Sequence, residues 1–76
     1  MVVVFTIDFC PSCMATKHWL RERDIEYHEL NVEQSERARE QFERISGRGI
    51  PTILVGKERI EGFNERRLHE LLNVRH

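Results

Sequence analysis

The sequence predicts a small α/β domain whose elements follow the order β-α-β-α-β-β-α. Two observations carry this prediction. Strand-like and helix-like segments alternate through the first part of the chain, which is typical of strands joined by helical crossovers. Near the end, Gly56-Lys57 separates two short strand-like segments, as a two-residue hairpin turn does. We therefore expect a four-stranded mixed sheet with helices on both faces, and a single domain over residues 1–76.

The chain opens with a buried strand and the helix that follows it. Residues 2–7, Val-Val-Val-Phe-Thr-Ile, are apolar on both faces, which suits a central strand. Pro11 fits the first turn of a helix, where a missing N–H costs nothing, so a helix is predicted over about 11–23. A second strand is predicted over 25–31. Because a helix joins these two strands, we expect them to be parallel and the crossover right-handed.

A second helix is predicted to begin near Ser35. Ala38, Phe42 and Ile45 follow each other at the spacing of one helix face, so this face is expected to pack on the core. Gly47 is predicted to follow the last turn as the residue that takes the left-handed conformation.

The final third of the chain supplies a hairpin and a last helix. A third strand is predicted over 51–55 and a fourth over 58–60, and the tight turn between them makes this pair antiparallel. Asn64 is a suitable N-cap for the last helix. Leu68, Leu71 and Leu72 then form its core-facing side.

Charge and composition exclude several classes of protein. Lys and Arg number 12 and Asp and Glu 13, which leaves a net charge of −1 and does not favour a nucleic-acid-binding surface. No apolar run approaches the roughly 20 residues of a membrane-spanning helix. The chain has only two cysteines, too few for the disulfide framework of a small secreted protein, so a cytoplasmic location is expected.

The chemistry is expected at Cys10-Pro11-Ser12-Cys13, between the first strand and the first helix. A cysteine at a helix N-terminus meets unpaired N–H groups and the positive end of the helix dipole, which favour the thiolate. A second thiol one turn later can displace a mixed disulfide and release the product. We therefore predict that Cys10 is the nucleophile and Cys13 the resolving thiol, with Pro11 and Ser12 completing the turn.

Two charged neighbours bear on this chemistry in opposite directions. Asp8 lies two residues before Cys10, and a nearby carboxylate would oppose thiolate formation. Lys17 lies one turn after Cys13 and would offset it. The sequence does not decide between them.

The alternatives for the cysteine pair are a metal site and a pair of inert thiols. A tetrahedral zinc site needs four ligands, and the chain offers two sulfurs and four histidines without paired ligand spacing. These histidines are His18, His28, His69 and His76. No metal ligand is assigned.

The residues resemble those of the glutaredoxin family, within the thioredoxin-fold superfamily, over nearly the whole chain. Residues 5–13 resemble the strand and active-site turn of the family, and residues 46–52, Ser-Gly-Arg-Gly-Ile-Pro-Thr, resemble the segment that leads to its cis-proline. Gly56-Lys57 resembles its hairpin, and residues 60–64 resemble its last turn before the final helix. The resemblance implies a minimal thioredoxin fold.

The resemblance also implies a function and a set of binding residues. It implies dithiol–disulfide exchange with Cys10 as the nucleophile, without a bound cofactor. It implies a cis Ile50–Pro51 bond facing Cys10, with the Ile50 backbone pairing with a bound thiol peptide. The far wall of the groove would be formed by Gly62, Phe63 and Asn64, with packing under the last helix as the alternative for Phe63.

The electron donor implied by the family is glutathione, but the sequence departs from the family pattern. Ile7 stands where many members carry a Lys that contacts glutathione, and Glu61 adds a negative charge beside Gly62. Lys17 and Arg48 are candidates to hold a glutathione carboxylate, with solvated surface charge as the alternative.

Other residues resemble the NrdH-type redoxins, which are usually reduced by thioredoxin reductase and serve ribonucleotide reductase. These are Gly62-Phe63 and the run Met-Ala-Thr-Lys at 14–17. An NrdH-type redoxin is therefore the alternative function. An iron–sulfur module, with a cluster shared between two subunits, is the alternative of another class and is not favoured. We expect a monomer whose substrate is a disulfide-containing protein.

Overall fold

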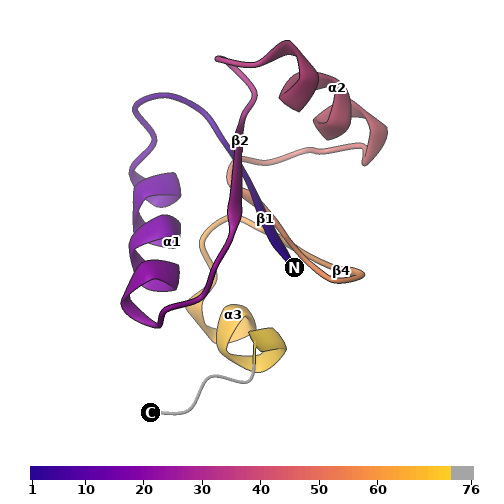
Figure 1. Ribbon diagram of the computed structural model, residues 1–76. Coiled ribbons are helices and arrows are strands. Elements are labelled where there is room, and N and C mark those ends of the chain that lie inside the picture. The colour runs from indigo at the N-terminus through magenta and orange to yellow at the C-terminus, as the bar shows by residue number, and fades with distance from the viewer. Residues whose placement is uncertain (73–76) are drawn as a thin grey trace.

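The computed structural model describes residues 1–72, and residues 73–76 lie outside the described part. Its elements follow the predicted order (Figure 1). They are β1 (Val2–Thr6), α1 (Pro11–Glu22), β2 (His28–Asn31), α2 (Glu36–Arg44), β3 (Thr52–Val55), β4 (Glu58–Glu61) and α3 (Glu65–Leu72).

The sheet has four strands in the order β2-β1-β3-β4. β1 and β2 are parallel, while β1–β3 and β3–β4 are antiparallel, so the predicted mixed sheet is confirmed. The apolar first segment is a central strand, as its sequence predicts, because a strand with neighbours on both sides and helices on both faces is shielded from water.

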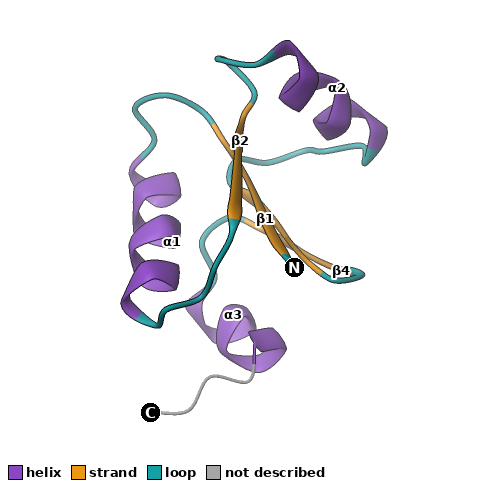
Figure 2. Ribbon diagram, in the orientation of Figure 1, coloured by secondary structure: helices purple, strands orange, loops and turns teal. Residues whose placement is uncertain are grey.

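The helices form layers on the two faces of this sheet (Figure 2). α1 and α3 cover one face and α2 the other. Val4, Leu20 and Leu68 are fully buried on the first face, where β1, α1 and α3 meet. On the second face the ring of Phe42 in α2 packs 5.4 Å from the ring of Phe5. The single sheet therefore separates two small clusters of apolar side chains.

The end of α2 differs from the prediction made for Gly47. Ser46, with φ 55°, takes the left-handed conformation instead. The N–H of Gly47 donates to the carbonyl of Phe42 at 2.9 Å and that of Ser46 to Glu43 at 3.0 Å, the two hydrogen bonds of a Schellman motif. Glycine is needed at 47 for another reason, since a Cβ there would overlap the ring of Phe42. The prediction for Gly47 was wrong because packing, not backbone conformation, fixes that residue.

The second strand is shorter than predicted. α1 ends in the same kind of motif, with Asp24 at φ 56° and the N–H of Ile25 donating to Leu20 at 3.0 Å. The residues between this motif and His28 carry the chain from the end of α1 back to the sheet. Pairing with β1 therefore begins only at His28, opposite Val3. Among the described residues no helix is long and apolar enough to cross a membrane.

Candidate active site

The two cysteines lie where β1 gives way to α1, and Cys10 is the N-cap of that helix. Its backbone is extended, and its Sγ accepts a hydrogen bond from the backbone N–H of Cys13 at 3.2 Å. Pro11 occupies the first helical turn, as its sequence position predicts. A sulfur thus takes the place that a Ser or Asp oxygen usually fills at a helix start. Both thiols are free and both side chains are largely buried.

The two thiols have different acidities. Burial opposes ionisation of Cys10, but hydrogen bonds from Cys13 and Ser12 outweigh it and hold the pKa of Cys10 below its ordinary value. Burial, followed by the hydrogen bond with Cys10, raises the pKa of Cys13 to about 11. Of the two thiols, Cys10 is therefore the one that ionises first as the pH rises.

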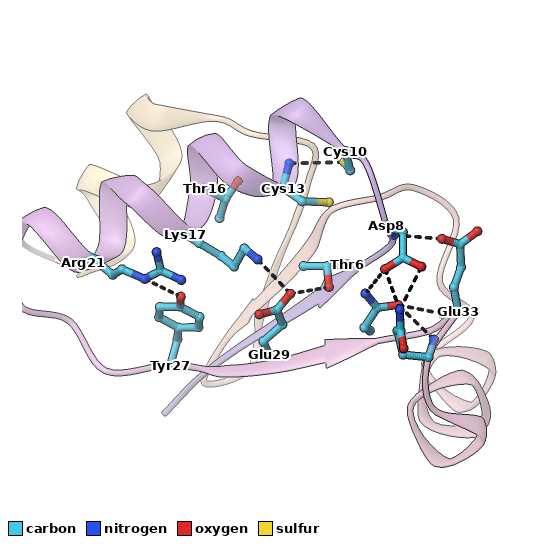
Figure 3. Close-up of polar contacts among 12 residues, drawn as sticks. Thr6, Asp8, Cys10, Cys13, Thr16, Lys17, Arg21, Tyr27, Glu29 and Glu33 are labelled. Atoms are coloured by element: carbon cyan, nitrogen blue, oxygen red, sulfur yellow. Dashed lines mark hydrogen bonds and ion pairs between the residues drawn. The ribbon is translucent and has the colours of Figure 1, made fainter.

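The carboxylate of Asp8 is bonded to two side-chain amides, one at the end of β2 and one in the connection from β2 to α2 (Figure 3). It accepts a hydrogen bond from Asn31 Nδ2 at 3.1 Å, and Gln34 Nε2 donates to both of its oxygens at 3.0 Å. The backbone N–H of Asp8 donates to Glu33 Oε1 at 2.8 Å. Asp8 therefore ties the loop before Cys10 to the neighbouring connection, while burial and hydrogen bonds from Cys13 and Ser12 dominate the pKa of Cys10.

Lys17 belongs to a small polar group under α1 (Figure 3). Its Nζ lies 3.0 Å from Glu29 Oε2 in β2, and Thr6 Oγ1 in β1 donates to the same oxygen at 2.8 Å. Partial burial opposes ionisation of Glu29, but the contacts with Lys17 and Thr6 outweigh it and hold the pKa of Glu29 below its ordinary value. Lys17 also acts on the thiol one turn earlier, where its charge lowers the pKa of Cys13.

Sequence reasoning missed Thr6 and Glu29. No motif in the sequence marks either residue. Glu29 contacts both Thr6 and Lys17 only because β1 and β2 pair in one particular register, with Val4 opposite Glu29. The signal available was weak: a Glu in the middle of a predicted strand next to a central one.

The segment around Pro51 meets the last turn before α3. The Ile50–Pro51 peptide bond is cis, and Pro51 is buried while Ile50 is half-buried. The carbonyl of Pro51 accepts a hydrogen bond from the N–H of Gly62 at 2.7 Å. Gly62 has φ 86°, a conformation that favours glycine. The fold thus brings together two of the segments from which the groove was predicted.

The other two residues of the predicted far wall have structural partners. Phe63 is half-buried and packs against the core formed by β1, α1 and α3. Asn64 accepts a hydrogen bond at its Oδ1 from the N–H of Arg67 at 3.1 Å, so it is the N-cap of α3 as predicted.

Arg48 lies apart from Lys17. It is exposed and lines an open cavity of about 400 Å³ together with Ser46, Arg59 and Glu61. Arg59 lies 3.7 Å from Glu61, so that cavity holds charges of both signs. Lys17, by contrast, is bonded to Glu29 under α1.

No three His, Cys, Asp or Glu side chains within residues 1–72 are grouped so that they could hold a metal ion. His76, one of the four histidines considered above, lies outside the described residues.

Comparison with known proteins places the chain in a family. Residues 2–60 match the model of the glutaredoxin family. A glutaredoxin-like 8.6 kDa protein of the rubredoxin operon of Clostridium pasteurianum is 29% identical over 73 residues, covering 95% of this chain and 97% of the relative. The glutaredoxin-like protein NrdH of Lactococcus lactis subsp. cremoris is 28% identical over 71 residues, covering 93% and 99%. The crystal structure of the thioredoxin-like protein BC3987 superimposes with a TM-score of 0.85 at 26% identity, covering 93% of this chain and 99% of that one.

Proposed function

The chain belongs to the glutaredoxin family, and on that premise we propose that it is a dithiol–disulfide oxidoreductase acting through Cys10 and Cys13. One observation carries the proposal: the two thiols sit one helical turn apart with their acidities separated, Cys10 below the ordinary value and Cys13 at about 11. Exchange needs a thiolate to attack and a second thiol that stays protonated until its turn, and the lower pKa of Cys10 and higher pKa of Cys13 favour this division.

The proposed reaction proceeds in two exchanges. The Cys10 thiolate attacks one sulfur of the substrate disulfide, forming a mixed disulfide and releasing the first thiolate. Cys13 then loses its proton and attacks Cys10 Sγ, which releases the second substrate thiol and leaves a Cys10–Cys13 disulfide. Two electrons pass to the substrate: the proton lost by Cys13 goes to the second leaving sulfur, and the first leaving thiolate takes its proton from water. The chain needs no bound cofactor for this reaction.

The substrate groove is proposed to lie along residues 50–51 and the turn at Gly62. Pro51 has no N–H, so it presents no donor to the sulfurs at that point of the backbone. The Ile50 backbone is the group proposed to pair with the substrate backbone. The hydrogen bond between Pro51 and Gly62 supports this assignment, because it holds the two segments together. Phe63 and Asn64 contribute through their backbone, since their side chains are engaged in the core and in the α3 cap.

Two electron donors remain candidates. Glutathione is the donor that the family implies, and Arg48 is the cation proposed to meet its carboxylate. Two observations favour the second candidate, an NrdH-type redoxin reduced by thioredoxin reductase and serving ribonucleotide reductase. Lys17 is already bonded to Glu29, and the NrdH protein of Lactococcus lactis aligns over 93% of this chain. Both donors belong to a reducing compartment, and we propose the cytoplasm.

The decisive experiment measures NADPH consumption during reduction of 2-hydroxyethyl disulfide. One arm couples the reaction through glutathione and glutathione reductase, and the other through thioredoxin reductase. Wild-type turnover in either arm, abolished in Cys10→Ser, supports the oxidoreductase and identifies the donor. The proposal is wrong if wild type shows no turnover in either arm and the fully reduced protein, mixed with the disulfide in equal amount, also fails to reduce it. A coloured protein purified without oxygen would instead support the iron–sulfur alternative.

A further inference from the structure

Phe9, the residue directly before Cys10, has an unusual environment for a large apolar side chain. It is fully exposed, at 100% of its accessible surface. Its φ is 53°, in the left-handed region that bulky residues rarely adopt. The other non-glycine residues with positive φ in the described chain, Asp24 and Ser46, follow the last turns of helices, where chain termination accounts for that conformation. No helix ends at Phe9, and its ring buries nothing within the fold.

This conformation is held from both sides. Before Phe9, the Asp8 carboxylate accepts hydrogen bonds from Asn31 and Gln34. After it, Cys10 is fixed as the N-cap of α1 by the N–H of Cys13. The loop is therefore fastened at residues 8 and 10, and Phe9 is left projecting into solvent between them.

The geometry of a mixed disulfide brings a partner to this ring. The Cα atoms of two bonded cysteines lie about 4.4–6.8 Å apart, and consecutive Cα atoms of one chain lie about 3.8 Å apart. The residues next to a target cysteine bonded to Cys10 therefore come within side-chain reach of Phe9. A small disulfide without a polypeptide chain has no such neighbours.

The two charged side chains that were considered for their effect on the thiols have partners within the fold. The Asp8 carboxylate is bonded to amides, and the Lys17 ammonium to Glu29. Large apolar side chains stand exposed on both sides of the cysteine pair along the chain, Phe9 at 100% and Met14 at 64%. An exposed apolar surface beside a reactive group is typical of a contact site.

We propose that Phe9 is a specificity-determining residue that packs against an apolar side chain next to the target cysteine. It selects disulfides of polypeptides with such a neighbour over small or polar disulfides. The inference rests on the proposed function. The electron balance is that of the exchange already described: Cys10 and Cys13 are oxidised to a disulfide, and the peptide disulfide is reduced to two thiols.

The test uses reduced protein without any electron donor, so its result does not depend on which donor the protein uses. Two self-quenched fluorescent peptide disulfides are compared, identical except for Leu or Ser beside the cysteine, together with 2-hydroxyethyl disulfide. Wild type is expected to react about tenfold faster with the Leu peptide than with the Ser peptide, the scale of a central aromatic contact. In Phe9→Ala this ratio falls to about one, while the rate with 2-hydroxyethyl disulfide is unchanged.

Two further variants separate the ring from the loop. Phe9→Tyr keeps the aromatic surface and is expected to keep the wild-type ratio. Asp24→Ala changes another exposed left-handed residue, after the end of α1, and should leave the ratio unchanged. Because each ratio is measured on one protein, a partly unfolded variant does not alter it. Equal rates of wild type with the two peptides, or an unchanged ratio in Phe9→Ala, overturn the inference alone. Failure of wild type with every disulfide overturns the proposed function as well.

Discussion

At the scale of single residues, the thiols of the active-site turn are tuned by neighbours of different kinds. Cys10 is controlled by its burial and by hydrogen bonds within the turn, whereas Cys13 also experiences the charge of Lys17 one turn later on α1. Glu29 in turn lies 3.0 Å from Lys17 and partly neutralises it. The acidity of the resolving thiol thus depends on a residue of β2.

This arrangement predicts opposite effects of two substitutions. Lys17→Met removes the cation that lowers the pKa of Cys13, so that pKa should rise relative to the same protein with Lys17 in place. Glu29→Gln removes the carboxylate that opposes Lys17, so the pKa of Cys13 should fall. The measurement is ultraviolet absorbance of the thiolate against pH in a Cys10→Ser background. Shifts of the same sign in both variants would show that Lys17 and Glu29 do not act on Cys13 as a pair.

A second residue-scale prediction concerns the glycine after α2. In Gly47→Ala the new methyl group would overlap the ring of Phe42, which packs on Phe5. We expect a loss of about 2 kcal/mol in the free energy of unfolding, as for other overpacked sites. Gly49→Ala is the matched control, because its Cβ would meet only Glu61 Cβ at 3.8 Å, an ordinary contact. Urea unfolding of the two variants should give a clearly lower free energy of unfolding for Gly47→Ala than for Gly49→Ala.

At the scale of elements, one polar group joins three of them. Thr6 in β1, Lys17 in α1 and Glu29 in β2 share a single carboxylate oxygen. This group fastens α1 to the edge strand, where apolar contacts are few, since β2 exposes His28 and Glu29. The short edge strand is thus held to the helix by polar contacts.

The lowered pKa of Glu29 makes this link sensitive to acid. A carboxyl group whose pKa is lower when folded contributes stability above its unfolded pKa, and the contribution disappears as the pH falls through the folded pKa. Wild type should therefore exceed Glu29→Gln in stability at neutral pH by at most about 1 kcal/mol, because the pair is partly screened by solvent. The difference should shrink below about pH 4.5. Thermal unfolding of both proteins at several pH values from neutral to below 4.5 checks this prediction. A stability difference that grows in acid would contradict the stabilising role given to the ionised Glu29.

At the scale of the whole molecule, a small core must hold three helices to one sheet. Leu68 is fully buried and connects α3 to the cluster on the first face. Trp19 is 4% exposed, and its Nε1 donates to Glu65 Oε2 at 3.2 Å, so its ring stands between α1 and α3. The only tryptophan of the chain therefore reports on the docking of the last helix.

Leu68→Ala is expected to destabilise the protein by about 3 kcal/mol, through lost burial and the cavity left behind. For a domain of this size that is a large share of the total stability. Unfolding followed by Trp19 fluorescence and by circular dichroism should coincide if the molecule unfolds as one unit. Release of Trp19 well before the loss of secondary structure would show that α3 detaches alone. Leu72→Ala, at a half-buried position of the same helix, is the milder comparison.

The sequence predicts the element order, the parallel first pair and antiparallel last pair of strands, and the starts of the helices, because each depends on neighbours along the chain. Asn64, Pro11 and the turn at Gly56 are examples. What it does not predict depends on register and packing between distant segments. The Thr6–Lys17–Glu29 group requires Val4 to stand opposite Glu29, and the need for Gly47 requires the position of the Phe42 ring. The bonds from Asn31 and Gln34 that hold Asp8 arise in the same way.

The position of the first residue has a practical consequence for attaching the protein to a surface. The N–H of Gly56 approaches the carbonyl of Met1 at 3.4 Å, so the chain begins beside the hairpin turn. β1 then runs away from this point across the sheet, and Cys10 follows at its other end. Five strand residues span about 16 Å. A bead or electrode linked at Met1 would therefore hold the molecule by the end remote from its thiols and leave them facing the solution.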